Sequence, residues 1–214
     1  MRFARVGRLV LAAVAITPMA EAADADATGA AAPVVVTLET TAGEIELAVF
    51  ADKAPLSAAD FLRYVDARLY DGAAFYRVVR ADNDRGTPKI AVIQGGLLDE
   101  TKALPPIAHE TTRDTGITHV DGTISLARGA PGTGGGAAFF ICVGDQPALD
   151  FGATRNPDGQ GFAAFGRVVS GMGVVRTIHA MKADAPSPSE YMQGQILPEP
   201  VVIRRAYRKP LPRG

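Results

Sequence analysis

The sequence predicts a mainly β protein built as a closed antiparallel barrel plugged by helices. Three observations support this fold class. About six to eight short apolar runs with β-type residues recur along the chain, only two stretches have helical periodicity, and the 214 residues include 23 glycines that separate the runs. Many short strands with glycine-rich turns are typical of barrels and sandwiches. The absence of an internal repeat indicates one domain.

The first two strand-like runs, residues 34–40 and 44–50, predict a β-hairpin. In the second run Ile45, Leu47 and Val49 alternate with polar or small residues. A period of two places the apolar side chains on one face and leaves the other face wet.

Two helices are expected, at residues 55–69 and 174–181. Pro55 suits a first helical turn, and Ser57 with Asp60 can serve the start. An apolar stripe at helical spacing follows, made of Phe61, Leu62, Val65 and Leu69. The second helix is opened by the glycines at 171 and 173.

The central part of the chain predicts strands at 75–79 and 90–94, joined by a polar loop at 80–89. Residues 97–121 have few apolar residues in register and are expected to be irregular. Further strands are predicted at residues 122–127, 138–143, 162–169 and 201–206.

The N-terminus has the pattern of a secretory signal peptide, with a basic start, a short apolar run and an Ala-x-Ala end. We expect residues 1–22 to be a signal peptide, 23–32 a flexible leader and 33–214 the domain. The apolar run is short for a bilayer span, so cleavage and a periplasmic location are expected, with an uncleaved anchor as the alternative. The single Cys142 excludes an internal disulfide and is interpreted as a small core residue.

Charge and motifs exclude several classes of function. The net charge of −1 with no basic block argues against a nucleic-acid partner. His109, His119 and His179 lack metal-ligand spacing and are interpreted as surface or loop residues. The glycines at 171–173 and 132–136 lack the rest of a dinucleotide or phosphate-binding motif. We therefore expect no metal and no cofactor.

Arg77 and Gln94 are the unusual residues of the two central strands, because each is a polar side chain in an apolar run. Gln94 also precedes two glycines, which allow backbones to approach closely. A buried arginine is costly unless it reaches a partner or a cleft. The pair indicates a strand-built groove with a fixed cation, although Arg77 could equally form an ion pair that braces the barrel.

Four ordered blocks resemble the cyclophilin-type peptidyl-prolyl isomerases. They are FYRVV at 75–79 with VIQGG at 92–96, GTISLA at 122–127 with FFI at 139–141, Leu149 with Asp150, and FGRVVSGM at 165–172. The resemblance covers roughly residues 34–207. It implies an eight-stranded antiparallel barrel capped by two helices, with a groove on its outside that binds Xaa-Pro segments.

The resemblance also implies roles for individual residues. Arg77 corresponds to the catalytic arginine of the family and Gln94 to its groove glutamine. Phe140 and Leu149 correspond to walls of the proline pocket. Phe162 stands where the family has a histidine or an aromatic residue. Val92, two residues before the glutamine, is included among the substrate-binding residues.

Two positions depart from the family pattern within the expected substrate-binding set. Ala91 stands where the family usually has phenylalanine, and Ala138 stands where it usually has a glutamine that binds the substrate backbone. The long loop at 80–89 makes the alignment of Ala91 depend on the position of the insertion.

The resemblance implies an isomerase that accelerates Xaa-Pro isomerisation during the folding of exported proteins. Its partners would be proline-containing unfolded or partly folded proteins, and the chain would be a monomer without stable membrane insertion. The alternative is a catalytically weak module or chaperone that binds proline segments on the same barrel. Arg77 favours the isomerase, whereas Ala91 and Ala138 favour the binding module.

Overall fold

The structure is a computed structural model that describes residues 32–129, 131–187 and 189–210. These residues belong to one compact unit, Ala31–Gly214. The predicted signal peptide at 1–22, and all but the last residue of the predicted leader at 23–32, lie outside the described residues.

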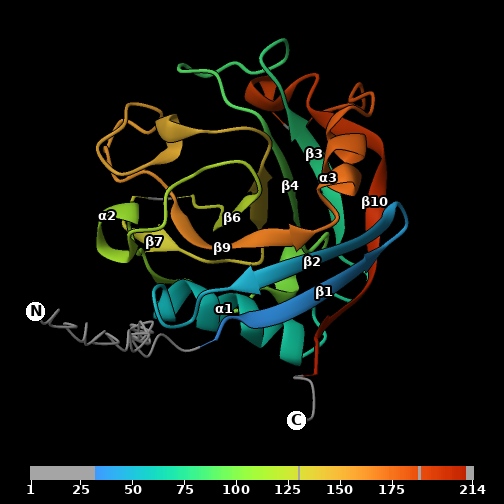
Figure 1. Cartoon of the computed structure of the whole chain (residues 1–214). Helices are drawn as coiled ribbons and strands as arrows, with labels where there is room; N and C mark the ends of the chain where they lie inside the picture. Colours follow the sequence, from blue (N-terminus) through green and yellow to red (C-terminus); the bar gives the residue numbers. More distant parts are fainter. Residues whose placement is uncertain (1–31, 130, 188, 211–214) are drawn as a thin grey trace, which may run out of the picture. The chain divides into compact units, whose positions relative to one another are not determined.

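Eight strands close into an antiparallel barrel, which confirms the predicted fold (Figure 1). Around the barrel the order is β1-β10-β3-β4-β8-β6-β9-β2. The eight barrel strands are β1 Val34–Thr40, β2 Gly43–Val49, β3 Ala74–Val79, β4 Val92–Gly96, β6 Thr123–Leu126, β8 Phe139–Cys142, β9 Ala163–Ser170 and β10 Ile196–Arg208. A separate ladder pairs β5 (Ile107–Ala108) with β7 (Thr133–Gly134).

The predicted hairpin is confirmed as β1 and β2, which pair in one register over their whole length. Ile45, Leu47 and Val49 are fully buried, while Glu44 on the opposite face is exposed. The alternation in the sequence therefore identified the core face of this hairpin.

Helix α1 (Pro55–Asp66) ends three residues before the predicted end at residue 69. Arg68 adopts a left-handed backbone with φ of 57°, which a right-handed helix cannot include. The predicted use of Ser57 and Asp60 at the helix start is not observed as a side-chain cap. Instead the Glu110 carboxylate accepts bonds from the amides of Leu56 and Ser57 and from the Ser57 hydroxyl.

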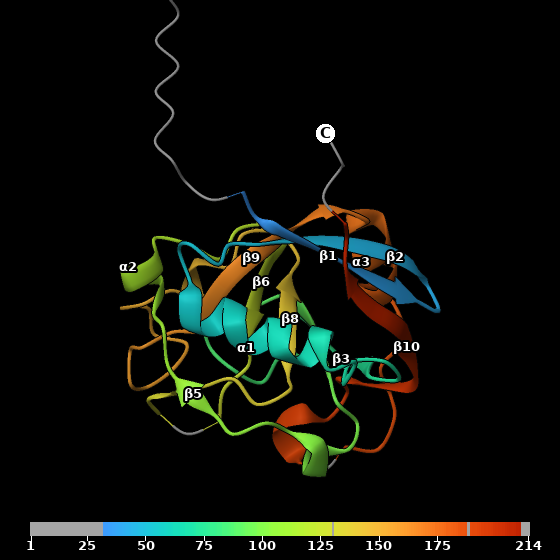
Figure 2. The same ribbon diagram turned by 90° about the horizontal axis from the view of Figure 1, so that it is seen from below.

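Helices α1 and α3 (Met172–His179) cover opposite ends of the barrel (Figures 1 and 2). In Figure 2, α1 lies across the end that faces the viewer. Its Phe61 ring lies between 5.0 and 5.4 Å from the rings of Tyr70, Phe139 and Phe165. The large aromatic rings thus fill the barrel end that α1 closes.

Several short elements lie where the sequence predicts none. Thr111 and Asp114 form a reciprocal capping box that begins α2 (Thr112–Thr115), within the stretch expected to be irregular. The described part of the chain also contains three 3₁₀ helices: η1 Glu100–Lys102, η2 Pro147–Leu149 and η3 Glu190–Met192. Among the described residues, no helix is both long and apolar enough to cross a bilayer.

Strand β4 begins at Val92, two residues later than predicted. The amides of Ile90 and Ala91 are bound by side chains, the first by Asp84 and the second by Gln146. These bonds take the place of ladder bonds for the two amides, although the Ala91 carbonyl still accepts from the Val143 amide just after β8.

Gly96 confirms the close approach expected of the two glycines after Gln94. Its φ is 149°, and a Cβ there would collide with the carbonyl oxygen of Ala137. A side chain at this position would therefore push β4 away from the start of β8.

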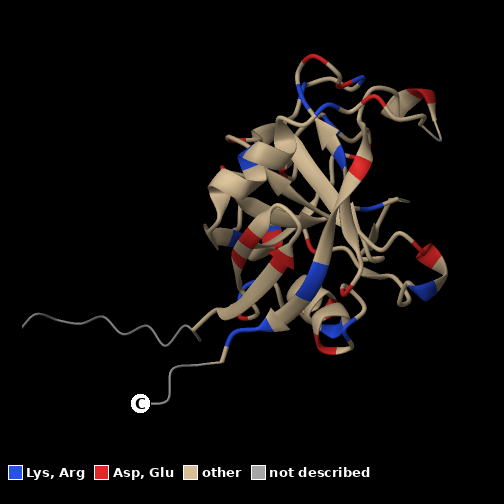
Figure 3. Ribbon diagram, turned by 90° about the vertical axis from the view of Figure 1, so that its right-hand side faces the viewer, with Lys and Arg blue, Asp and Glu red and all other residues tan. Residues whose placement is uncertain are grey.

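Acidic and basic residues are interspersed over the compact unit in the view of Figure 3.

Candidate active site

A row of four residues runs across neighbouring strands on the outer face of the barrel. Arg77 on β3 pairs with Gln94 on β4, Gln94 with Phe140 on β8, and Phe140 with Ser125 on β6. Directly paired residues in antiparallel strands project to the same face. Their neighbours Ile93 and Phe139 point to the other face, into the core. The fold thus places a cation, an amide and an aromatic ring side by side outside the core.

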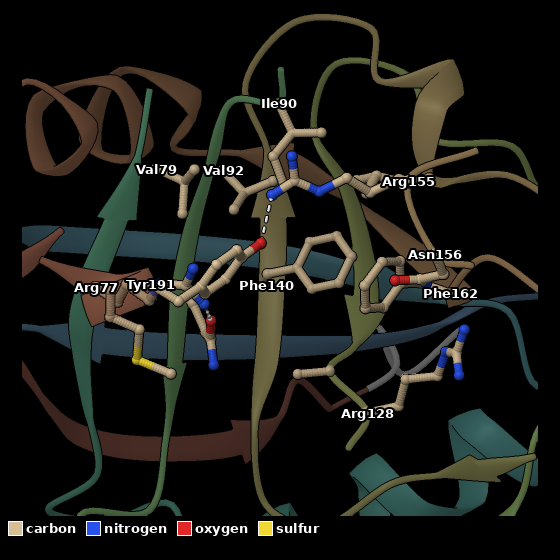
Figure 4. Close-up of a pocket in the computed structure, with 14 residues that line it drawn as sticks. Arg77, Val79, Ile90, Val92, Arg128, Phe140, Arg155, Asn156, Phe162 and Tyr191 are labelled. Atoms are coloured by element: carbon tan, nitrogen blue, oxygen red, sulfur yellow. Dashed lines mark hydrogen bonds between the residues drawn. The ribbon is translucent and has the colours of Figure 1, made fainter. Parts of the chain in front are cut away.

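The floor beside this row is a second apolar cluster, distinct from the barrel core. Its buried members are Val79, Val92, Phe140, Cys142 and Leu149, with Ile90, Ala127 and Phe162 packed against them. The rings of Phe140 and Phe162 meet edge to face, with centroids 5.3 Å apart. This cluster lines a pocket of about 310 Å³ that opens to the surface next to Arg77 (Figure 4).

The structure brings six of the eight predicted site residues together around that pocket. They are Arg77, Val92, Gln94, Phe140, Leu149 and Phe162. Ala138 lines an adjoining hollow that shares Gln94 with the pocket. Ala91 lines neither of these two cavities, and Ile90 takes a place in the pocket wall.

Arg77 is oriented by two neutral amides. Its Nε and one terminal nitrogen donate to the Oε1 atom of Gln195 at 2.9 and 2.6 Å, and its other terminal nitrogen donates to Oε1 of Gln94 at 2.8 Å. A guanidinium has five N–H donors. Within the described residues, one donor on each terminal nitrogen therefore has no partner.

No carboxylate among the described residues lies within ion-pairing distance of Arg77, so the ion-pair brace considered from the sequence is not found. Burial lowers the pKa of Arg77 below its usual value, and the nearby Tyr191 and Tyr76 oppose that shift. An arginine remains protonated at neutral pH even so. The site therefore contains a fixed positive charge that no acid neutralises locally.

The side-chain amide of Gln94 already makes two hydrogen bonds within the protein. Its Oε1 accepts from Arg77, and its Nε2 donates to the Tyr76 hydroxyl at 3.1 Å. The amide orientation is assigned from this network. One N–H of Gln94 remains for a ligand, because an amide nitrogen carries two.

The outer wall of the pocket consists of two arginines bound to carboxylates. Arg128 donates two bonds to Asp158, and Arg155 donates two bonds to Asp84. The Arg128 guanidinium holds the pKa of Asp158 at about 2, below its usual value of 3.8. Sequence reasoning missed both pairs, since their partners lie far apart in the chain and follow no motif.

His119 lies in a loop, one of the two roles expected for it, but it is not at the surface, because only 1% of it is exposed. Its Nδ1 lies 2.7 Å from Asp150 and its Nε2 lies 3.0 Å from the Ser125 hydroxyl. This connectivity is that of a Ser-His-Asp triad. The Ser125 side chain is completely buried, however, and no substrate can reach it. The His119 ring stacks on Phe140 with centroids 5.9 Å apart, so it supports the pocket wall from behind.

The described residues contain no group of three or more His, Cys, Asp or Glu side chains arranged to hold a metal ion. Cys142 is a free, buried thiol, and burial raises its pKa above the usual range. Its reading as a small core residue is confirmed.

Comparisons with known proteins identify the family to which the chain is similar. The family described as "Cyclophilin type peptidyl-prolyl cis-trans isomerase/CLD" matches residues 35–206. The peptidyl-prolyl cis-trans isomerase A of Dickeya dadantii is 33% identical over 94% of this chain and 97% of its own length. The peptidyl-prolyl cis-trans isomerase B of Escherichia coli is 32% identical over 67% of this chain and 83% of its own length.

A solved structure supports the fold independently. The cyclophilin type peptidyl-prolyl cis-trans isomerase of Cryptosporidium parvum superposes with a TM-score of 0.59, at 15% identity, over 84% of this chain and 99% of its own. The same fold, a family match over most of the chain and relatives above 30% identity lead to one conclusion. The chain belongs to the cyclophilin-type peptidyl-prolyl cis-trans isomerases.

Proposed function

We propose that the outer groove isomerises Xaa-Pro bonds with Arg77 as its catalytic residue. The observation that carries this role is the Arg77 guanidinium, which is charged, fixed by two amides and still has unused donors beside an apolar pocket. Rotation about a peptide bond is opposed by a barrier of about 18–20 kcal/mol, because the C–N bond loses its double-bond character as it twists. No nucleophile or cofactor is needed to lower such a barrier.

Arg77 acts on the charge that appears in the twisted state. When resonance breaks, the prolyl nitrogen regains a lone pair, which a nearby N–H can bind. The planar substrate lacks this acceptor, so the hydrogen bond stabilises the twisted state selectively. Because Gln94 and Gln195 are neutral, they orient the guanidinium without cancelling its charge.

The pocket holds the proline ring while the preceding carbonyl rotates. Phe140, Leu149 and Phe162 supply its apolar walls, and Val92 contributes to its floor. The free N–H of Gln94 binds a backbone carbonyl of the substrate. Ala91 contributes no wall, and Ile90 contributes that apolar surface instead.

The second candidate function, a catalytically weak module that binds proline segments, is favoured by Ala138. This residue lines the hollow next to Gln94 and has no side-chain amide to hold a substrate backbone. The two functions predict different responses when that amide is supplied.

Ala138→Gln is expected to raise kcat/KM for a proline-containing peptide by about two- to tenfold, since one added neutral hydrogen bond contributes roughly 0.5–1.5 kcal/mol. NMR exchange between the cis and trans peptide measures this rate. Ala180→Gln, at an exposed position after α3, is the matched control. An unchanged kcat/KM in Ala138→Gln would mean that the missing amide does not limit the enzyme.

We infer further that the enzyme acts in the periplasm on exported proteins that are unfolded or partly folded. The signal-peptide pattern at residues 1–22 supports this location. After expression of the full chain, the mass of the protein in the periplasmic fraction should correspond to loss of those residues. Full-length protein in the cytoplasm alone would contradict the proposed location. Acceleration of a proline-limited refolding reaction tests the proposed clients.

A further inference from the structure

Tyr191 extends over the pocket from η3 and is accounted for by none of the roles above. In Figure 4 it reaches from the side of Arg77 toward Arg155, with Phe140 next to it. Its side chain belongs to the pocket lining although the residue is 46% exposed. Phe140 and Leu149, by contrast, are at most 5% exposed. Phe162 is partly exposed, so Tyr191 is the most exposed aromatic residue of the pocket lining.

The Tyr191 hydroxyl is held by a rigid partner. It accepts a hydrogen bond of 2.8 Å from Arg155. Arg155 itself is 5% exposed and is fixed by two bonds to the fully buried Asp84 carboxylate and by a third to the Pro88 carbonyl. Because the hydroxyl accepts from Arg155, its own proton is left for an acceptor in the pocket.

The same short segment also controls the catalytic cation. The Tyr191 ring lies 5.7 Å from the Arg77 guanidinium carbon. Gln195, four residues later, accepts two bonds from Arg77 at its Oε1 and donates from its Nε2 to the Asn83 carbonyl. A bound segment that reaches the free donors of Arg77 therefore passes beside the Tyr191 ring.

We propose that Tyr191 is a second substrate-binding residue, whose hydroxyl donates to a backbone carbonyl of the proline-containing segment while its ring packs against that segment. This proposal rests on the proposed function of the groove. This contact lowers the Kd for the peptide and leaves the exchange rate of the bound peptide unchanged. The carbonyl oxygen of the reacting amide loses negative charge when resonance breaks. A hydrogen bond from the Tyr191 hydroxyl to that oxygen is therefore no stronger in the twisted state than in the planar one. A donor to a neighbouring carbonyl is indifferent to the twist.

Tyr191→Phe tests the hydroxyl and keeps the ring. With an end-blocked Ala-Ala-Pro-Ala peptide, Kd from NMR titration should rise about two- to tenfold, the effect of one neutral hydrogen bond. The cis/trans exchange rate at saturating peptide should stay unchanged. Tyr191→Ala should raise Kd further, because the ring contact is also lost. Tyr207→Phe on β10, outside both cavities, is the matched control and should leave Kd unchanged.

Three results would overturn the proposal: an unchanged Kd in both Tyr191 variants, a lower Kd in Tyr191→Ala, or a fall in the saturated rate with Kd unchanged. The second result would identify Tyr191 as a cover that competes with substrate. Failure of the proposed isomerase function is separate, since it would appear as peptide binding by the wild-type protein without any catalysed exchange. The Kd comparison between wild type and Tyr191→Phe remains decisive in that case.

Discussion

Arg77→Ala is expected to reduce the saturated cis/trans exchange rate about ten- to a hundredfold. A hydrogen bond from a charged donor contributes roughly 1.5–3 kcal/mol, and 1.36 kcal/mol corresponds to a tenfold change in rate. The loss should fall on the rate and much less on Kd, because the proline ring is held mainly by Phe140, Leu149 and Phe162. NMR exchange spectroscopy at saturating peptide measures the rate, and titration measures Kd.

Arg77→Lys separates charge from geometry. An ammonium carries a compact charge without a planar fork of donors. Three different nitrogens of Arg77 donate to Gln94 and Gln195, an arrangement that a single ammonium nitrogen does not reproduce. Its rate should therefore stay well below that of the wild type. Arg204→Ala, at an exposed arginine of β10, is the control for loss of charge. A wild-type rate in Arg77→Ala would remove Arg77 from the mechanism.

Arg155→Ala is expected to have the largest effect on stability, about 3–5 kcal/mol less free energy of unfolding at neutral pH. The substitution leaves Asp84 as a buried carboxylate without its cation. Asp84 keeps only the amides of Gly86 and Ile90 as partners. These bonds fix the loop that leads into the pocket wall, so loss of the pair should also weaken peptide binding.

The pH dependence of this effect follows from Asp84. Burial alone would raise its pKa, but the bonds from Arg155 and from the two amides outweigh burial and lower the pKa below the usual 3.8. A lowered pKa gives stability that is fully present above 3.8 and is lost as the pH falls through the folded-state value. Without Arg155 the pKa of Asp84 in the folded variant lies above its wild-type value. The difference between wild type and Arg155→Ala should therefore be largest near neutral pH and shrink as acid protonates Asp84, first in the variant and then in the wild type.

Urea denaturation at several pH values measures this difference. Arg208→Ala is the matched control, because the Arg208–Asp66 pair has both side chains about half exposed. Exposed pairs contribute roughly 0–1 kcal/mol. If Arg155→Ala cost no more than Arg208→Ala, the buried pair would not stabilise the pocket wall.

Elements with local periodicity could be predicted from the sequence. The alternation of Ile45, Leu47 and Val49 identified a hairpin, and the apolar stripe of residues 61–65 identified α1. The bounds of elements were less predictable, since they depend on distant side chains. The left-handed backbone of Arg68 ends α1 early, and Asp84 with Gln146 delays the start of β4.

The residues of the site also divide into those that the sequence reveals and those that it does not. Arg77 and Gln94 could be found because each is a polar side chain in an apolar strand, and paired strands bring them together. Gln195 and Arg155 lie on loops and Tyr191 in the short helix η3. Polar residues are ordinary in such segments, so nothing local marks these three. Their roles arise from contacts between segments that are distant in the chain, for example 118 residues from Arg77 to Gln195. Such contacts leave no signal in a single sequence.

Cis/trans exchange of the Ala-Ala-Pro-Ala peptide with catalytic amounts of wild-type protein tests the central claim most directly. Uncatalysed exchange takes tens to hundreds of seconds. We expect the protein to bring exchange into the range that NMR exchange spectroscopy detects, and the Arg77→Ala variant to lose most of that acceleration. An exchange rate equal to that of buffer, with peptide still bound in the groove, would contradict catalysis and leave a module that binds proline segments.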